Sequence, residues 1–226
     1  MIIGISGLAR TGKSTVADFL SEFNMVSLSF ADPMKRIAKD VYDFEDEHLW
    51  GASEMRSVPD KRYPRDHGPM IDEKCACCGA VMIHGDAPQC YLTPRFALQQ
   101  FGTELGRICY QKTWIDYALR TAERIIKNNN LEYDCKNGLY ESRCDYAQPR
   151  KVVITDVRFP NEIKALKEVG KIIRIKRTGY EKPLWNHPSE TEQLAIPDSA
   201  FDFLINNDGN LDDLQNKVFS LVQNLG

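Results

Sequence analysis

Short apolar runs alternate with segments of helical periodicity along most of this chain. Five runs have the length of a strand and cover residues 2–6, 25–30, 151–155, 171–176 and 201–206. The run KVVIT is almost continuously apolar, which is typical of a strand buried on both faces of a parallel sheet. Between the runs, apolar residues recur at helical spacing and predict helices that begin near residues 13, 32, 93, 114, 160 and 211. Strands that alternate with helices predict an α/β fold with a mainly parallel sheet and helices on both faces.

Three of the predicted helices carry start signals. We expect Asp32 to be an N-cap followed by Pro33 at the first helical position. Thr93 and Pro94 form the same pair before the next predicted helix. Asn210 is expected to cap the last helix, because acidic residues that favour a first turn follow it.

Two stretches depart from this alternating pattern. Residues 45–92 hold four prolines, several glycines and four of the seven cysteines, so we predict an irregular, cysteine-rich insertion there. Residues 177–197 have the loop-rich composition of a lid. We therefore predict a single domain over residues 1–226, in which the insertion and the lid are attached to one α/β core.

Composition and charge exclude several classes of protein. The chain is 42% hydrophobic and 27% charged, and its net charge of −3 is not that of a protein that coats nucleic acids. No apolar run approaches the ~18 residues that cross a bilayer, and the N-terminus lacks the features of a secretion signal. The seven cysteines are an odd number, which argues against a disulfide framework. We expect a cytoplasmic protein with no membrane partner and no stably bound nucleic acid.

The segment GLARTGKS, directly after the first apolar run, matches the phosphate-loop pattern G-x-x-x-x-G-K-[ST]. Gly7 and Gly12 let the backbone curl so that N–H groups point at phosphate oxygens, and Lys13 supplies positive charge to the β and γ phosphates. The Ser14 hydroxyl is the expected Mg²⁺ ligand. Arg10 is either a further charge for the transferred phosphoryl group or a surface residue. The alternative is a glycine turn with a solvated lysine. The predicted ATP-binding residues are Gly7, Leu8, Ala9, Arg10, Thr11, Gly12, Lys13, Ser14 and Thr15.

A nucleotide kinase must also hold an acceptor phosphate, which requires basic residues outside the loop. The candidates that lie after predicted strands or on the middle helix are Lys35, Arg36, Arg95, Arg107 and Arg158. Asp156 directly follows an apolar strand, as a Walker B acid does, and would hold Mg²⁺ directly or through water. Its alternative role is to cap the helix that begins near Pro160. The chain contains no N-K-x-D guanine signature, which argues against a GTPase.

Several dispersed motifs together resemble one family, the bacteriophage deoxynucleoside monophosphate kinases. These motifs are SGLARTGKSTVADFL, FADPMKRIA, TPRFALQQFGTELGR with Trp114 beyond it, TDVRFPNEIKAL, HPSETE and INNDGNLDDL. The resemblance implies a three-layer phosphate-loop NTPase fold, with phosphoryl transfer from ATP·Mg²⁺ to a deoxynucleoside 5′-monophosphate for DNA precursor synthesis. It is compatible with a homodimer, although no surface pattern in the sequence demonstrates one.

The resemblance also assigns roles to single positions. Lys13, Ser14 and Arg10 would serve the donor phosphates, and the INNDGN turn resembles the adenine-side loop of the family. Trp114 would stack on the acceptor base; its alternative is an ordinary core position. The positions that would line the acceptor side are Lys35, Arg95, Asp156, Arg158 and Glu162.

The insertion carries a second candidate site, a zinc knuckle within KCACCGAVMIHGDAPQC. Cys75 and Cys78 have knuckle spacing, and His84 and Cys90 would complete a tetrahedral set. Cys135 and Cys144 are competing ligands, and free thiols are the alternative to any metal. Zinc, if bound, would have a structural role. The insertion departs from the family pattern, and its effect on the acceptor is open.

Two other functions remain as alternatives at this point. One is a kinase for another small metabolite of the dephospho-coenzyme A type. The other is a nucleic-acid-binding module that uses ATP as a switch, which the slightly acidic composition disfavours. Which nucleobases are accepted, modified ones included, depends on pocket shape, which the sequence does not encode locally.

Overall fold

The computed structural model covers residues 1–226, and the structure describes all of them except 68–69, 72–73, 76–88, 143–149, 181–187 and 226. The predicted ligands Cys78 and His84 lie outside the described residues. The described chain divides into two compact units, one formed by Met1–Phe30 with Trp114–Gly226 and the other by Ala31–Thr113. The predicted insertion 45–92 lies within the second unit.

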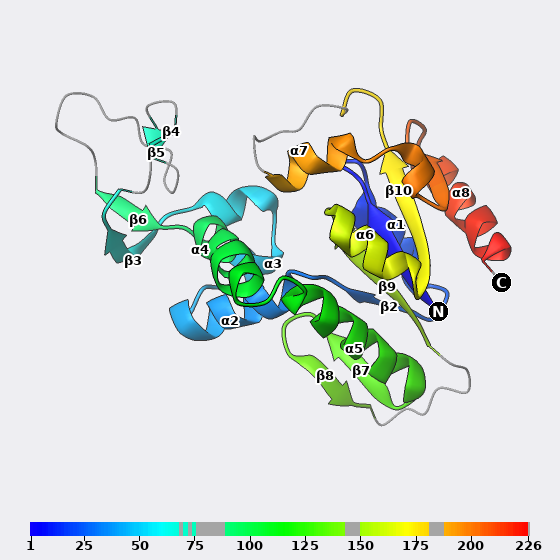
Figure 1. Ribbon diagram of the computed structural model, residues 1–226, viewed down its shortest axis with the longest axis horizontal. Coiled ribbons are helices and arrows are strands. Elements are labelled where there is room, and N and C mark those ends of the chain that lie inside the picture. Colours follow the sequence, from blue (N-terminus) through cyan, green and yellow to red (C-terminus); the bar gives the residue numbers. More distant parts are fainter. Residues whose placement is uncertain (68–69, 72–73, 76–88, 143–149, 181–187, 226) are drawn as a thin grey trace. The chain divides into compact units, whose positions relative to one another are not determined.

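The first unit contains the α/β core. Its elements are β1 (Ile2–Ser6), α1 (Lys13–Ser21), β2 (Met25–Leu28), α5 (Thr113–Lys127), β7 (Leu131–Asp134), β8 (Gly138–Glu141), β9 (Lys151–Val157), α6 (Pro160–Lys167), β10 (Gly170–Lys176), α7 (Pro188–Ala195), a 3₁₀ turn (Asp198–Ala200), β11 (Phe203–Asn206) and α8 (Leu211–Asn224). Five of these strands form a parallel sheet in the order β11-β10-β1-β9-β2 (Figure 1). β1 is central, so the loop that follows it opens between the ends of β9 and β10. Ligands of open α/β sheets bind at such a point.

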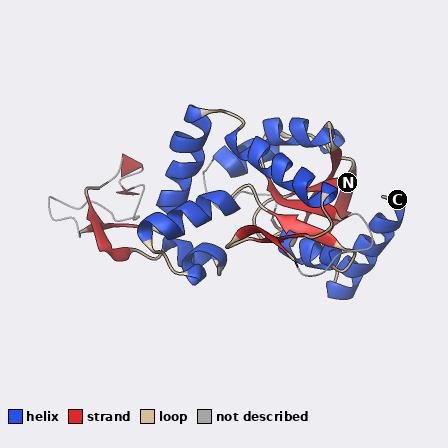
Figure 2. Cartoon of the chain, turned by 90° about the horizontal axis from the view of Figure 1, so that it is seen from below, coloured by secondary structure: helices blue, strands red, loops and turns tan. Residues whose placement is uncertain are grey.

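Helices pack on both faces of this sheet, as the alternating pattern predicts (Figure 2). On one face, α1 and α8 contact the strands through a buried cluster that includes Ile3, Val16, Ile173 and Leu214. On the other face, α6 lies so close to β1 that a Cβ on Gly4 would be 2.9 Å from Cδ1 of Leu166. The predicted α/β class with a parallel sheet is therefore confirmed.

The second unit has a small core of its own. Its elements are α2 (Asp32–Tyr42), α3 (Asp46–Trp50), a 3₁₀ turn (Ser53–Ser57), β3 (Asp60–Arg65), β4 (Met70–Ile71), β5 (Lys74–Cys75), β6 (Cys90–Leu92), α4 (Pro94–Gln100) and a π-helical turn (Phe101–Arg107). Strands β3 and β6 pair antiparallel, as do β4 and β5. The core consists of Ala38, Phe44, Leu49 and Ala97, with further aromatic rings packed against it.

The start signals were right for two helices and wrong for one. The Thr93 hydroxyl accepts a hydrogen bond from the Phe96 N–H at 3.2 Å, and Asn210 Oδ1 accepts one from the Asp213 N–H at 2.8 Å. Asp32 is not an N-cap: α2 begins at Asp32 itself, after Ala31, so its carboxylate acts in the first turn.

The sequence reading missed the antiparallel hairpin β7–β8. Its turn contains Asn137-Gly138, a dipeptide that favours tight hairpins, and Gly138 has a φ of +86°. Asp134 Oδ1 accepts hydrogen bonds from the N–H groups of Lys136 and Asn137 at 3.0 and 2.8 Å. The region from 45 to 92 is also less irregular than predicted, since its described residues include α3 and four short strands.

Candidate functional site: the phosphate loop and its surroundings

The loop between β1 and α1 has a backbone that only glycine accommodates at two positions. Gly7 has a φ of +152°, and a Cβ there would lie 2.5 Å from the carbonyl oxygen of Ile175. Gly12 has a φ of +99°, and its Cβ would lie 2.5 Å from Nδ2 of Asn207. These two residues are the fixed glycines of the phosphate-loop pattern, so the motif has the structural context that its chemistry needs.

The curled loop is held from inside and from the neighbouring strand end. Thr11 Oγ1 donates a hydrogen bond to the Leu8 carbonyl at 2.9 Å. Asn207, just after β11, donates from Nδ2 to the Thr11 carbonyl at 2.9 Å, and both residues are buried. Asn207 was not singled out by sequence reasoning, although it lies within the INNDGN turn.

Lys13 folds back over the loop. Its Nζ donates hydrogen bonds to the carbonyl oxygens of Gly7 and Leu8, at 2.7 and 2.6 Å. Lys13 is also the first residue of α1, and the N-cap Gly12 has no side chain to occupy the first N–H groups of that helix. The positive end of the helix and the ammonium group thus face the same small region, which favours an anion. Arg10 and Ser14 are exposed at this loop.

Asp156 lies at the end of β9, beside the start of the loop. In the β1–β9 ladder, Ser6 pairs with Val157, the next residue along. The Asp156 carboxylate accepts hydrogen bonds from Ser29 Oγ and from the Phe30 N–H, both at 2.7 Å. These contacts fix the acid against the end of β2.

Glu162 is the carboxylate that satisfies the start of α6. It is 4% exposed, and its Oε2 accepts hydrogen bonds from the N–H groups of Arg158 and Phe159 at 2.8 and 3.0 Å. It therefore fixes the turn that carries Arg158, which is half-buried. The predicted role of both side chains toward an acceptor stays a prediction.

Two further predicted residues, Arg95 and Lys35, have contacts within the second unit, and Trp114 is buried. Arg95 donates from Nε to Ser57 Oγ at 2.8 Å and from a terminal nitrogen to the Ser53 carbonyl at 2.8 Å. Lys35 Nζ lies 5.7 Å from the centre of the Trp50 ring. Trp114, in the first turn of α5, is 9% exposed. Their roles in acceptor binding stay predictions.

A cavity of about 440 Å³ opens beside the loop in the first unit. The loop residues Leu8 and Thr11 line it together with the end of β10 and with Tyr180, Asn206 and Asp208. The Arg177 guanidinium lies 5.4 Å from the centre of the Tyr180 ring. The Thr178 N–H donates to Asp208 Oδ1 at 2.7 Å, and this hydrogen bond is the main cause that lowers the pKa of Asp208.

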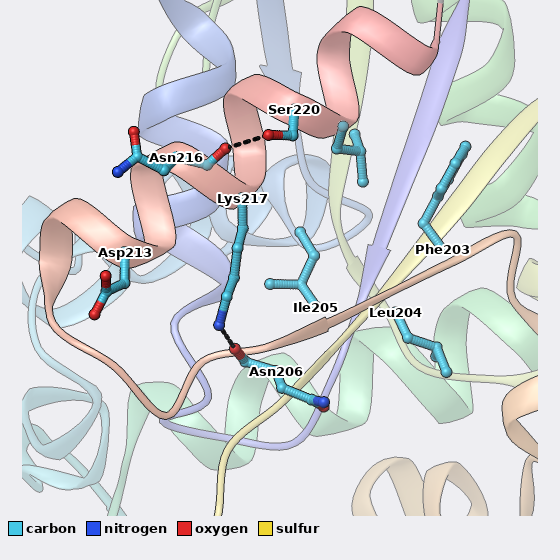
Figure 3. Close-up of a pocket in the computed structure, with 9 residues that line it drawn as sticks. Phe203, Leu204, Ile205, Asn206, Asp213, Asn216, Lys217 and Ser220 are labelled. Carbon is cyan, nitrogen blue, oxygen red and sulfur yellow. Dashed lines mark hydrogen bonds between the residues drawn. The ribbon is translucent and has the colours of Figure 1, made fainter.

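A second cavity, of about 720 Å³, lies between β11 and α8 and involves no phosphate-loop residue (Figure 3). Two of its polar side chains donate hydrogen bonds to backbone carbonyls of the chain itself. Lys217 Nζ donates to the Asn206 carbonyl at 2.7 Å, and Ser220 Oγ donates to the Asn216 carbonyl at 2.9 Å. We therefore assign the candidate site to the cavity beside the phosphate loop.

The end of the predicted lid is attached to the sheet. Gln193 in α7 is 1% exposed, and its Nε2 donates to Ser6 Oγ at 3.0 Å and to the Val157 carbonyl at 3.1 Å. Arg174 in β10 donates to the carbonyls of Ile196 and Gln193, at 2.5 and 3.3 Å. The amide of Gln193 thus contacts the residue that precedes the phosphate loop. A single glutamine in a loop-rich stretch gave no sequence signal for this contact.

The predicted zinc ligands are brought together only in part. Cys75 and Cys90 have their sulfur atoms 3.9 Å apart, and the side chain of His67 completes a group of three. His67 was not in the predicted set.

No family model matches the chain. The chain is 27% identical over 228 residues to a protein of Acanthamoeba polyphaga mimivirus named "Putative deoxynucleotide monophosphate kinase", and the match covers 99% of this chain and 97% of that protein.

Among solved structures, the chain is similar to dephospho-CoA kinase from Campylobacter jejuni, with 14% identity, a TM-score of 0.46 and coverage of 98% of this chain and 95% of that one. It is also similar to shikimate kinase from Aquifex aeolicus, with 10% identity, a TM-score of 0.45 and coverage of 99% and 96%. TT1252 from Thermus thermophilus matches with 13% identity, a TM-score of 0.45 and coverage of 100% and 98%.

Among the helices that the structure describes, none is both long and apolar enough to cross a membrane. The chain is thus an α/β protein whose central strand leads into a loop that carries the phosphate-loop glycines. Over its whole length it is similar to a viral protein named as a putative deoxynucleotide monophosphate kinase.

Proposed function

We propose that this protein is a phosphotransferase that transfers the γ-phosphoryl group of ATP to a deoxynucleoside 5′-monophosphate. The observation that carries the proposal is the loop between β1 and α1. Gly7 and Gly12 let the loop curl where a Cβ would collide with Ile175 or Asn207, and Lys13 and the N-terminus of α1 supply positive charge to the loop. This arrangement fits the phosphates of a nucleoside triphosphate.

On the donor side, Lys13 would exchange its contacts with the loop carbonyls for the phosphate oxygens. Ser14 would offer its hydroxyl to Mg²⁺, and Asp156, held by Ser29 and Phe30, would face the ion directly or through water. When bound, Mg²⁺ neutralises charge on the phosphates and orients them. Arg10, exposed on the loop, would add charge at the transferred group.

The cavity beside the loop would hold the donor base. Tyr180 and Arg177 line this cavity, and the INNDGN turn supplies Asn206 and Asp208. An aromatic ring that stacks on a base contributes about 1–3 kcal/mol. Leu8 and Thr11 of the loop also line this cavity, so a nucleotide whose base occupied it would have its phosphates near the loop.

On the acceptor side, we propose that Arg158, Arg95 and Lys35 neutralise the monophosphate and that Trp114 stacks on its base. Asp156 or Glu162 would accept hydrogen bonds from the sugar or the base. The reaction would be an in-line transfer with no covalent enzyme intermediate, in which positioning and charge neutralisation do the catalytic work. A phosphate acceptor needs little deprotonation, so no general base is required.

The acceptor class rests on the whole-length similarity to the viral protein, together with the motifs of the sequence. A kinase for another small phosphorylated metabolite is the second candidate, because the donor side would be the same. We further propose that the protein works in the cytoplasm, without a membrane or nucleic-acid partner; a homodimer and a bacteriophage origin stay predictions.

A coupled ADP-release assay across the deoxynucleoside monophosphates tests the proposal. We expect turnover with at least one of them and none with dephospho-coenzyme A. Lys13→Ala should lower kcat by about 10²–10³-fold or more, because it removes a charge that stabilises the transition state. Lys127→Ala is the matched control, since Lys127 is an exposed lysine paired with Glu123 at the end of α5. Absence of turnover with every nucleotide, or a Lys13→Ala variant as active as the control, would refute the assignment.

A further inference from the structure

The second unit contains a cluster of two cysteines and one histidine that has no place in phosphoryl transfer. His67 follows β3, Cys75 ends β5 and Cys90 begins β6, so three separate segments meet there. We propose that these three side chains bind a zinc ion and that this ion fastens the strands of the second unit to one another. The proposal goes beyond the kinase function and does not depend on it.

The spacing of the ligand atoms fits a metal rather than a covalent bond. The histidine nitrogen and the two sulfur atoms all lie within 4.8 Å of one another, and the two sulfurs are 3.9 Å apart. Two thiolates at about 2.3 Å from a tetrahedral zinc ion lie about 3.8 Å apart. A disulfide needs about 2.05 Å between the sulfurs.

The ligand types also select the metal. Two thiolates with one imidazole suit zinc, whereas magnesium and calcium prefer oxygen ligands. The fourth position of the tetrahedron belongs to water or to another side chain.

The surroundings explain why a cross-link is needed here. Cys75 and Cys90 are 1% and 0% exposed, but among the described residues the apolar cluster around them adds only Phe96. Strands β4 and β5 have two residues each and β6 has three. Two-stranded ribbons of this length are not stable by themselves in water, and a structural zinc ion supplies the missing folding free energy.

The neighbouring contacts position Cys90 before a metal arrives. Arg65 pairs with Cys90 in the β3–β6 ladder, and the Arg65 guanidinium lies 4.0 Å from the centre of the Phe96 ring. Gln89 Nε2 donates to the Arg65 carbonyl at 3.0 Å and to the Cys90 carbonyl at 2.9 Å. These contacts hold the backbone on both sides of the Cys90 thiol, and the ion would join this thiol to Cys75 and His67.

The first experiment measures metal in the unmodified full chain. Protein purified under reducing conditions from zinc-supplemented cells should contain about one zinc per chain by mass spectrometry. After exchange with cobalt(II), its absorption spectrum should show tetrahedral bands and thiolate-to-cobalt charge transfer. An intensity that corresponds to two or three thiolates supports the site. A metal-free protein whose cobalt spectrum lacks thiolate bands overturns it, as does a Cys75–Cys90 disulfide found by peptide mass spectrometry.

The second experiment tests the ligands. The double variant Cys75→Ser/Cys90→Ser and the single variant His67→Ala should lose zinc, whereas Cys109→Ser, which changes an exposed cysteine of the same unit, should retain it. Removal of zinc from the unmodified chain by a chelator should speed hydrogen exchange in β3 and β6 by at least tenfold. Full zinc content in the double variant, or exchange that a chelator leaves unchanged, overturns the proposal. The chelator experiment uses the unmodified chain, so its result does not depend on whether a variant folds. Kinase activity is measured independently in the ADP-release assay.

Discussion

Gly12→Ala is the most direct test of the phosphate-loop geometry. Gly12 has φ +99° and ψ +19°, in the left-handed region where a side chain costs about 1–2 kcal/mol. The new Cβ would also lie 2.5 Å from Asn207 Nδ2, so the 2.9 Å hydrogen bond from Asn207 to the Thr11 carbonyl is displaced. A buried carbonyl that loses its donor costs a further ~1–3 kcal/mol. We therefore expect a loss of about 2–5 kcal/mol in the free energy of unfolding.

Gly179→Ala is the matched control, because it separates backbone strain from the collision. Gly179 has a φ of +84°, but a Cβ there would meet nothing within 4 Å. Only the conformational cost applies, about 1–2 kcal/mol. For a protein of this size we expect a Tm decrease of about 4–20 °C for Gly12→Ala and about 2–8 °C for Gly179→Ala, by circular dichroism.

A double-mutant cycle with Asn207→Ala isolates the contact. Once Asn207 is truncated, Gly12→Ala should cost at least ~1 kcal/mol less than in the unmodified chain, because there is no hydrogen bond left to displace. If Gly12→Ala and Gly179→Ala lower the Tm equally, and the cycle shows no coupling, the proposed dependence of the loop on Asn207 is wrong.

Three other substitutions give independent tests. Asp156→Ala removes the acceptor of the Ser29 hydroxyl and of the Phe30 N–H, so the free energy of unfolding in urea should fall by about 1–3 kcal/mol. Turnover should also be lost. Unchanged stability would contradict the described contacts. Trp114 is 9% exposed, so Trp114→Ala should lower the free energy of unfolding by about 3–5 kcal/mol. Stacking on the acceptor base is a separate readout: it predicts that the acceptor KM rises more for Trp114→Ala than for Trp114→Phe. The hydrogen bond from Arg62 lowers the pKa of Asp60, so its stabilising effect is present above the unfolded pKa of about 3.9 and is lost as the pH falls through the folded pKa. The Tm difference between the unmodified chain and Asp60→Asn should therefore be visible at pH 7 and shrink steadily as the pH falls below about 3.9. A difference that stays constant over this range would refute the charge-based explanation.

The local elements of the core could be predicted from the sequence because their signals are local. The runs at 2–6 and 151–155 are strands, and the caps at Thr93 and Asn210 form as expected. The hairpin β7–β8 was missed although its Asn137-Gly138 turn is a recognised signal. Asp32 was misplaced by one position, since a helix start is fixed by backbone geometry that neighbouring residues share.

Only the tertiary structure decided the contacts between residues that lie far apart in the chain. Asn207 supports the phosphate loop across 196 positions, and Gln193 reaches Ser6 across 187. His67 lies near Cys75 and Cys90 because the segment after β3 meets β5 and β6 there, and no regular spacing in the sequence indicates this grouping.

The sequence by itself determined the phosphate-loop motif, the strands and helices around it and the class of fold. Only folding placed β9 between β1 and β2 and brought Asn207 and Gln193 against the loop and the strand before it. The physical reason is that a glycine pattern or an apolar run is encoded by adjacent residues. A hydrogen-bond partner is selected by the packing of the whole sheet, which no short segment contains.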